Sequence, residues 1–162
     1  MSDAENGSRL ESFNLDHTRA RAPYVRGAGR YSGDRGDRIT KFDLRFVQPN
    51  QAEIPTAALH TIEHLLAGFL RDGLGDSVID ASPMGCRTGF YLTVFGEPAA
   101  EEVVSALVSA LRRISVHDGD IPGCSELECG NWRDHSLPGA RGWALEVLAS
   151  EMIVQETVTL DS

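Results

Sequence analysis

Residues 56–70 read Thr56-Ala57-Ala58-Leu59-His60-Thr61-Ile62-Glu63-His64-Leu65-Leu66-Ala67-Gly68-Phe69-Leu70, and this stretch decides the fold of the chain. Its apolar residues recur at intervals of three and four, which predicts an amphipathic helix. Pro55 precedes the stretch and suits a helix start, and Asp72-Gly73 follows it and suits a helix end. The sequence therefore predicts a helix from about residue 56 to residue 72.

The predicted helix carries an H-x-x-E-H motif made of His60, Glu63 and His64. Positions four apart lie on one face of a helix, so the two imidazoles point the same way and can share one divalent cation. The neighbouring carboxylate can move protons without binding the metal. Two histidines at this spacing also occur on helices that hold no metal, and a zinc-like site needs three or four ligands. The rest of the chain must supply the others.

Further ligands are expected in the loop-rich segment 115–138. The candidates there are His117, Cys124, Cys129 and His135. Cys129 precedes Gly130, which lets the backbone approach closely, whereas His117 stands beside Asp118 and suits a solvated loop. A thiolate with two imidazoles leaves a fourth tetrahedral position open, which is typical of a catalytic metal site. The residues favour Cys129 but leave Cys124 open.

A second thiol, Cys86, lies between two glycines in the turn-rich stretch 83–89 and next to Arg87. A cationic neighbour and an exposed loop favour a reactive thiolate. A small buried apolar residue is the alternative, and the sequence leaves both interpretations open.

The composition argues against nucleic-acid-binding, membrane-spanning and disulfide-rich secreted proteins. The 24 acidic and 15 basic residues give a net charge of −9, which argues against nucleic-acid or anionic-membrane partners. No apolar run approaches the roughly 18–20 residues of a membrane span. The polar, acidic N-terminus shows no signal peptide, so we expect a cytoplasmic protein. Three cysteines without an export signal indicate reduced thiols rather than a disulfide framework.

The order of predicted elements indicates an α+β fold. We expect residues 1–10 to form a disordered tail and 11–162 a single catalytic domain. Strands are predicted at 22–26, 38–46, 77–82 and 90–96, and further helices at 97–114 and 141–153. Gly27-Ala28-Gly29 opens no helix and is not expected to bind phosphate. This order predicts an α/β sandwich in which a mainly antiparallel sheet packs against helices, with the metal site on the central helix.

Seven blocks of sequence, in order over roughly residues 10–150, together resemble the S-ribosylhomocysteine lyase (LuxS) family. They are Ser12-Phe13-Asn14-Leu15-Asp16-His17-Thr18, Ala22-Pro23-Tyr24-Val25-Arg26, Gly33-Asp34-Arg35-Gly36-Asp37, Lys41-Phe42-Asp43-Leu44-Arg45-Phe46, His60-Thr61-Ile62-Glu63-His64-Leu65, Ser82-Pro83-Met84-Gly85-Cys86-Arg87-Thr88-Gly89-Phe90-Tyr91 and Cys129-Gly130-Asn131-Trp132-Arg133-Asp134-His135. Each block alone is weak evidence, whereas the set is highly specific.

The resemblance implies a role for each matching residue. His60, His64 and Cys129 would bind one Fe(II) per subunit, replaceable by zinc or cobalt, which decides against Cys124. Glu63 and Cys86 would be the acid/base pair. The substrate pocket would be lined by Ser12, His17, Lys41, Arg45 and Asp80. The family is a homodimer whose two active sites lie at the interface, with some of these residues coming from the partner chain.

The reaction implied by the resemblance cleaves S-ribosylhomocysteine to homocysteine and 4,5-dihydroxy-2,3-pentanedione. It proceeds by two carbonyl migrations and a β-elimination. The pentanedione is the precursor of autoinducer-2, which links the family to quorum sensing and to the methyl cycle.

The chain departs from the family pattern at two positions near the metal cysteine, neither of them catalytic, and the residues also permit two other interpretations of the site. Ser125 and Glu128 replace the family's usual Asn and Gln before the metal cysteine, and Glu128 adds negative charge there. One alternative is an H-x-x-E-H zinc metallopeptidase, which shares only the five-residue motif and uses a downstream Glu as its third ligand. The other is a non-catalytic, metal-stabilised binding module with Cys124 as the fourth ligand.

Overall fold

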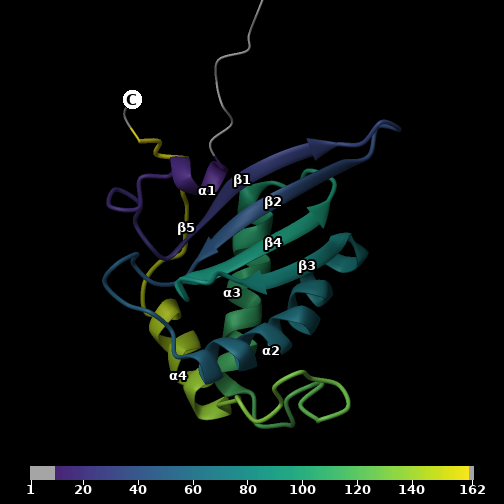
Figure 1. Ribbon diagram of the computed structural model, residues 1–162, viewed down its shortest axis with the longest axis vertical. Coiled ribbons are helices and arrows are strands. Elements are labelled where there is room, and N and C mark those ends of the chain that lie inside the picture. The colour runs from purple at the N-terminus through teal and green to yellow at the C-terminus, as the bar shows by residue number, and fades with distance from the viewer. Residues whose placement is uncertain (1–9, 161–162) are drawn as a thin grey trace, which may run out of the picture.

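The computed structural model describes residues 10–160 of the chain (Figure 1). Its elements, in order, are α1 Glu11–Asn14, β1 Tyr24–Ser32, β2 Arg38–Arg45, α2 Thr56–Leu74, the 3-10 turn η1 Gly75–Ser77, β3 Val78–Pro83, β4 Gly89–Phe95, α3 Ala100–Val116, α4 Leu137–Leu148 and β5 Ile153–Val154. Apart from Leu10, the predicted disordered tail lies outside the described residues. No helix in this range is long and apolar enough to cross a membrane.

The strands form one five-stranded sheet in the order β3-β4-β2-β1-β5. All neighbouring strands run antiparallel except β1 and β5, which are parallel. Phe42 on the central strand β2 lies opposite Leu92 of β4 and Gly27 of β1. The predicted α+β fold with a mainly antiparallel sheet is confirmed.

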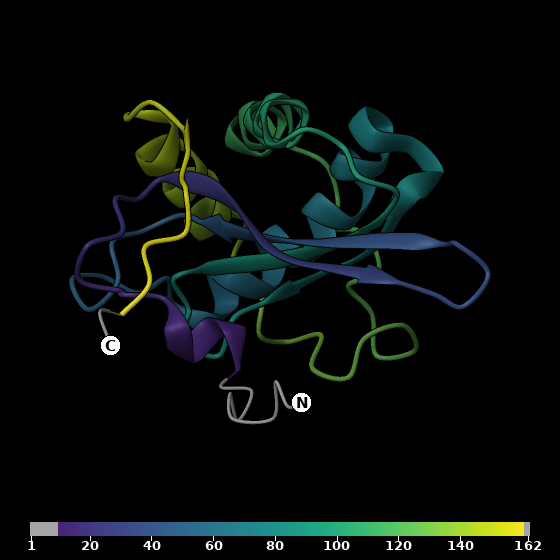
Figure 2. The ribbon, with the colours of Figure 1, turned by 90° about the horizontal axis from the view of Figure 1, so that it is seen from above.

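The two faces of the sheet have different neighbours. Successive side chains of a strand point to opposite faces, so Phe42 and Leu44 of β2 face one way and Lys41, Asp43 and Arg45 face the other. Phe42 and Leu44 belong to the main hydrophobic core. Figure 2 shows α1 on the side of the sheet opposite to α3. The charged face of β2 is therefore directed toward the side that carries α1.

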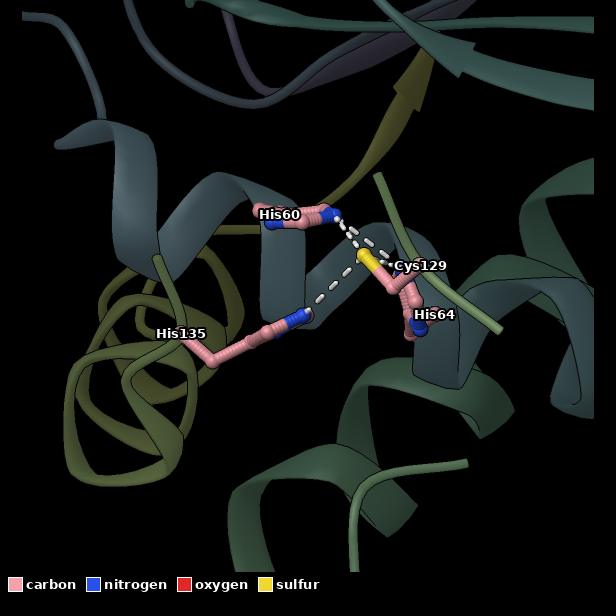
Figure 3. Close-up of side chains that lie close together, drawn as sticks. All are labelled: His60, His64, Cys129 and His135. Carbon is pink, nitrogen blue, oxygen red and sulfur yellow. Dashed lines mark hydrogen bonds between the residues drawn. The ribbon is translucent and has the colours of Figure 1, made fainter. Parts of the chain in front are cut away.

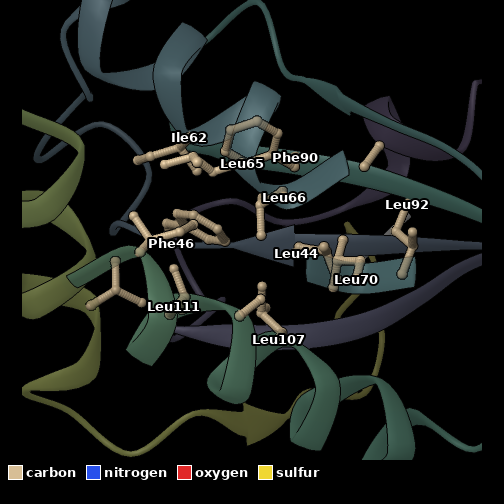
Figure 4. Close-up of a cluster of buried hydrophobic side chains, with 14 of the residues drawn as sticks. Leu44, Phe46, Ile62, Leu65, Leu66, Leu70, Phe90, Leu92, Leu107 and Leu111 are labelled. Atoms are coloured by element: carbon tan, nitrogen blue, oxygen red, sulfur yellow. The ribbon is translucent and has the colours of Figure 1, made fainter. Parts of the chain in front are cut away.

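The core lies between the sheet and the helices α2 and α3 (Figure 4). Ile62 and Leu66 of α2 are 0% exposed, as are Leu107 of α3 and Phe90 of β4. Burying each such side chain contributes roughly 1.5–3 kcal/mol. This packing fixes the rotation of α2 and leaves a second flank of the helix half-buried, with His60, Glu63 and His64 on it.

The last helix differs from the prediction, because it spans Leu137–Leu148 rather than 141–153. Its N-cap is Ser136, whose hydroxyl accepts a hydrogen bond from the Gly139 amide, and a proline stands in its first turn. Ile153, predicted as helical, instead begins β5 and donates its amide hydrogen to the Pro23 carbonyl. Strand β5 was not predicted.

Strand β1 is longer than predicted, because it continues through Gly27-Ala28-Gly29 to Ser32. A bulge lies between the two glycines. The Tyr31 side chain covers Gly29, where an added Cβ would lie 2.8 Å from the Tyr31 hydroxyl oxygen. Gly29 therefore serves close packing, and both glycines lie within a strand rather than at the start of a helix.

Candidate active site

Four side chains converge beside α2 (Figure 3). His60 and His64 come from the helix, and Cys129 and His135 come from the segment between α3 and α4. Their donor atoms all lie within 4.8 Å of one another. The two histidine Nε2 atoms are 3.1 Å apart, and Cys129 Sγ lies 3.4 Å from Nε2 of His60 and 3.8 Å from Nε2 of His64.

Hydrogen bonds to the backbone orient both helical histidines. Nδ1 of His60 lies 2.9 Å from the Asp134 carbonyl oxygen, and Nδ1 of His64 lies 2.7 Å from the Pro122 carbonyl oxygen. A carbonyl oxygen only accepts, so Nδ1 of each ring is the donor and the neutral ring keeps its Nε2 lone pair. Metal-binding histidines are held in this way, with the far nitrogen anchored and the near one free.

These donors fit a divalent cation. Two Nε2 lone pairs that face each other at 3.1 Å repel unless a positive charge lies between them. A tetrahedral site with bonds of about 2.05 Å to nitrogen and about 2.3 Å to sulfur has edges of about 3.4 Å and about 3.6 Å. The distances among His60, His64 and Cys129 lie close to these values.

His135 belongs to the same group. The Thr61 hydroxyl donates to the Ala57 carbonyl and accepts from the Ser136 amide, so it also accepts from Nδ1 of His135 at 3.0 Å. The ring of His135 stacks on His60 with centroids 3.9 Å apart, and its Nε2 is 4.0 Å from Cys129 Sγ. Burial lowers the pKa of His135, and repulsion from any positive charge on His60 or His64 lowers it further. The ring therefore favours its neutral form, with a lone pair directed at the cluster.

The other two ligand candidates lie apart from this group. The Cys124 thiol lies 3.4 Å from the Trp132 carbonyl oxygen, and the His117 Nε2 lies 3.0 Å from the Asp120 carbonyl oxygen. Neither belongs to the four-donor group found among the described residues. The donors are imidazoles and a thiolate, without the carboxylate ligand that the metallopeptidase alternative requires.

Cys86 lies in a separate pocket of about 380 Å³. Its thiol is 3.1 Å from the Thr88 hydroxyl oxygen and 3.9 Å from Nη1 of Arg45. The pocket is also lined by Ser12 and His17 from the α1 region. Of the two interpretations that the sequence left open for Cys86, the buried apolar residue is wrong, because the residue is exposed and its thiol forms no disulfide.

Local backbone geometry shapes the loop that carries Cys86. The Arg87 amide donates to the Met84 carbonyl, and Arg87 has a φ of 60°, in the left-handed region. An added Cβ at Gly89 would overlap the Leu44 carbonyl oxygen, so only glycine lets this end of the loop lie against β2. The loop is thereby held against the strand that provides Arg45.

The remaining predicted residues lie on the same sheet or on α2. The Lys41 ammonium lies 3.9 Å from the ring centroid of Tyr91, which lines the Cys86 pocket. Asp80 is exposed on β3 and accepts a hydrogen bond from the Ser82 hydroxyl. Glu63 is half-buried on α2, beside His64.

Two groups of predicted residues thus lie in different places. The pocket of about 380 Å³ and an adjoining one of about 390 Å³ are both lined by His17, Arg45 and Cys86. Neither is lined by any of the four metal-site side chains. Within one chain, the metal cluster and the Cys86 pocket are separate.

Comparison with known proteins identifies the family. The S-Ribosylhomocysteinase (LuxS) family profile matches residues 10–158. The chain belongs to the LuxS family. It is 58% identical over 153 residues to the S-ribosylhomocysteine lyase of Deinococcus deserti, which covers 94% of this chain and 98% of the relative. The same enzyme name belongs to relatives from Deinococcus radiodurans and Thermus thermophilus, each 55% identical, over 95% and 96% of this chain and 97% and 99% of the relatives.

Two buried side chains that the sequence analysis did not single out support the two parts of the site. Asp43 is completely buried on the charged face of β2 and contacts Arg45 of the Cys86 pocket. Thr61 is completely buried on α2 and anchors His135. The signal for Asp43 was its position between Lys41 and Arg45 on an alternating strand. Thr61 follows His60 directly, but its partner lies 74 positions away, so no local pattern indicated its role.

Proposed function

We propose that this LuxS-family protein is an S-ribosylhomocysteine lyase, which cleaves the thioether of its substrate to homocysteine and 4,5-dihydroxy-2,3-pentanedione. The observation that carries this proposal is the cluster of His60, His64 and Cys129 in a chain that matches the family over residues 10–158. The names of its relatives at 55–58% identity support the same activity. The product would be the precursor of autoinducer-2.

The metal in this proposal is Fe(II), replaceable by zinc or cobalt, with one ion per subunit held by His60, His64 and Cys129. A mixed set of imidazole and thiolate ligands is compatible with each of these metals. When bound, the ion supplies Lewis-acid polarisation of the substrate's carbonyl and hydroxyl oxygens. His135 lies beside the same donors, so this proposal has a third imidazole near the bound ion.

The chemistry requires proton transfers at neighbouring carbons. The thioether is β to a carbonyl only after the carbonyl has moved from C1 to C2 and then to C3 of the sugar. Each move removes a proton α to a carbonyl and returns one to the adjacent carbon, and the last step expels homocysteine thiolate, which must gain a proton. Side chains that can both accept and donate protons are therefore needed on more than one side of the substrate.

We assign these proton transfers to Cys86 and Glu63. The Cys86 thiolate takes and returns protons in the isomerisation steps, next to the Arg45 guanidinium at 3.9 Å. Glu63 takes part in isomerisation and returns a proton to the departing thiolate. Ser12, His17, Lys41, Arg45 and Asp80 bind the substrate in this proposal.

The protein acts as a homodimer with both active sites at the interface in this proposal. Because the Cys86 pocket and the metal cluster are separate in one chain, a second chain is needed to bring them to one substrate. Exposed apolar side chains near the Cys86 pocket and near the metal cluster support a covering partner. Phe13 lines the pocket and is 62% exposed, and Leu127, in the segment between α3 and α4 that carries Cys129, is 95% exposed. The free thiols suit a reducing cytoplasm.

The direct test is to supply anaerobically purified protein with S-ribosylhomocysteine and to follow the release of free thiol. We expect activity in the parent protein and its loss in Cys86→Ala and Glu63→Gln, with metal content unchanged. Cys124→Ala is the matched control, because this thiol lies outside both groups, and it should keep metal and activity. Normal turnover in Glu63→Gln or Cys86→Ala would contradict the role of that residue, and an inactive, metal-loaded parent would contradict the activity.

A further inference from the structure

A buried carboxylate, Asp43, lies at the centre of the charged face of β2. It is 0% exposed and contacts two guanidinium groups that are themselves 1% and 2% exposed, those of Arg26 and Arg45. Arg45 donates through Nε to Oδ1 at 3.1 Å and through Nη2 to Oδ2 at 2.9 Å, and Arg26 Nη2 donates to Oδ2 at 3.1 Å. The Tyr24 hydroxyl donates to the same oxygen at 3.2 Å.

The bidentate contact fixes the plane of the Arg45 guanidinium and thereby the direction of its third nitrogen, Nη1. That nitrogen donates to the Thr88 hydroxyl at 2.7 Å and lies 3.9 Å from Cys86 Sγ. A guanidinium is planar and presents its donors in a rigid fork, so anchoring two nitrogens on Asp43 aims the third. A lysine at this position could not span both partners.

The second arginine connects the same carboxylate to α1. Arg26 Nη1 donates to the Glu11 carboxylate and to the Thr157 hydroxyl. Glu11 precedes Ser12, which lines the Cys86 pocket. Asp43 therefore holds together both walls of the pocket, one built from the α1 region and one from β2 and the Cys86 loop.

We propose that Asp43 is a positioning residue, which holds Arg45 so that its Nη1 faces the Cys86 thiol and stabilises negative charge on sulfur. The proposal rests on the role of Cys86 given above, although it concerns the reactivity of the thiol and not turnover. The other charged or titratable groups that line the two pockets around this thiol are His17, Glu53, Arg87 and Tyr91.

The sign of one measurement separates this role from its rivals. If the Asp43 charge acted directly on the thiol, removing it would make the thiolate easier to form and alkylation faster. If Asp43 were merely structural, a folded variant would react at the parent rate. If Asp43 acts by positioning, Arg45 loses its anchor and alkylation slows.

The experiment measures the rate of Cys86 alkylation by iodoacetamide against pH in the full-length protein, with the modified peptide quantified by mass spectrometry. In Asp43→Asn we expect the profile to move to higher pH and the rate at neutral pH to fall about tenfold, as a shift of one pH unit would give. Arg45→Lys should move the profile the same way, because it keeps the charge but loses the fork. If Asp43→Asn does not fold, the pH profile of Arg45→Lys still tests the proposal.

Glu97→Gln is the matched control. It removes a surface carboxylate that pairs with Arg38, and Arg38 lies on the same strand, β2, as Asp43. It should leave the profile unchanged. An unchanged or faster reaction in folded Asp43→Asn, or a parent-like profile in Arg45→Lys, would overturn the proposal. Because alkylation does not require turnover, inactivity of the parent protein, or full activity of Cys86→Ala, would contradict the proposed function and leave this result standing.

Discussion

Replacing Thr61 by valine tests how the segment between α3 and α4, which carries Cys129 and His135, is attached to α2. Threonine and valine are both β-branched and nearly isosteric, so the helix and the packing change little. The substitution removes an oxygen that is 0% exposed and that accepts from the Ser136 amide at 2.9 Å and from Nδ1 of His135 at 3.0 Å. Its bond to the Ala57 carbonyl is also lost.

The magnitude follows from the two donors left without an acceptor. A buried polar group without a partner costs about 1–3 kcal/mol. Ser136 and His135 are both half-buried, so each contributes near the lower end, and we expect Thr61→Val to lower the free energy of unfolding by about 2 kcal/mol. Thr61→Ser keeps the oxygen and loses one methyl group, which costs about 1 kcal/mol.

Urea denaturation of the metal-free proteins measures the difference. With a denaturant dependence of about 2 kcal/mol per molar, Thr61→Val should shift the midpoint down by about 1 M and Thr61→Ser by about half as much. The ring nitrogens of His135, followed by nitrogen-15 NMR, should show a single tautomer in the parent and in Thr61→Ser but a mixture in Thr61→Val. A valine variant as stable as the serine variant, or one that keeps the single tautomer, would refute this account of the hydroxyl.

Three further outcomes follow. Cys129→Ser should weaken cobalt(II) binding at least about 100-fold and abolish the sulfur-to-cobalt absorption band, whereas Cys124→Ser should change neither. Leu66→Ala empties a site that is 0% exposed between α2 and the sheet, so thermal or urea unfolding should show a loss of about 2–5 kcal/mol; a loss below about 1 kcal/mol would contradict the packing. Burial, and secondarily the Asp43 charge, raises the pKa of Tyr24 to about 12, above the unfolded value near 10. The resulting stabilisation is complete below pH 10 and is lost between pH 10 and 12. Burial also raises the pKa of Tyr91, so in Tyr24→Phe the late phase of tyrosinate absorbance should shrink by the amplitude of one tyrosine.

The helices and central strands could be predicted because their signals are local. The three- and four-residue spacing of apolar residues in 56–70 marks α2, and the alternation in 38–46 marks β2. The start of α4 was misplaced because the N-cap Ser136 was not recognised. Strand β5 has two residues and exists only because it pairs with β1, more than 120 positions earlier.

In the candidate site, too, residues with a local sequence signal could be predicted, whereas residues placed by long-range contacts could not. His60 and His64 were predicted from their spacing on one helix. Cys129 could not be chosen over Cys124 from the residues alone, because the segment between α3 and α4 has no periodicity and its geometry is set by contacts with α2. The family resemblance indicated Cys129, and the structure brings this thiol to the two histidines together with His135, which had been one of four open candidates.

The charged face of β2 shows what residue patterns miss. Alternation placed Asp43 and Arg45 on the face opposite the apolar core, where solvent exposure is the usual expectation, yet they are 0% and 2% exposed. Buried ion pairs seldom add net stability, because desolvation offsets most of the attraction, and well-packed apolar residues often replace them without loss. A network of two arginines and a carboxylate is therefore poorly explained by stability alone. Its geometry, which aims one guanidinium nitrogen at the Cys86 thiol and ties α1 to the same pocket, is better explained by the chemistry of that pocket.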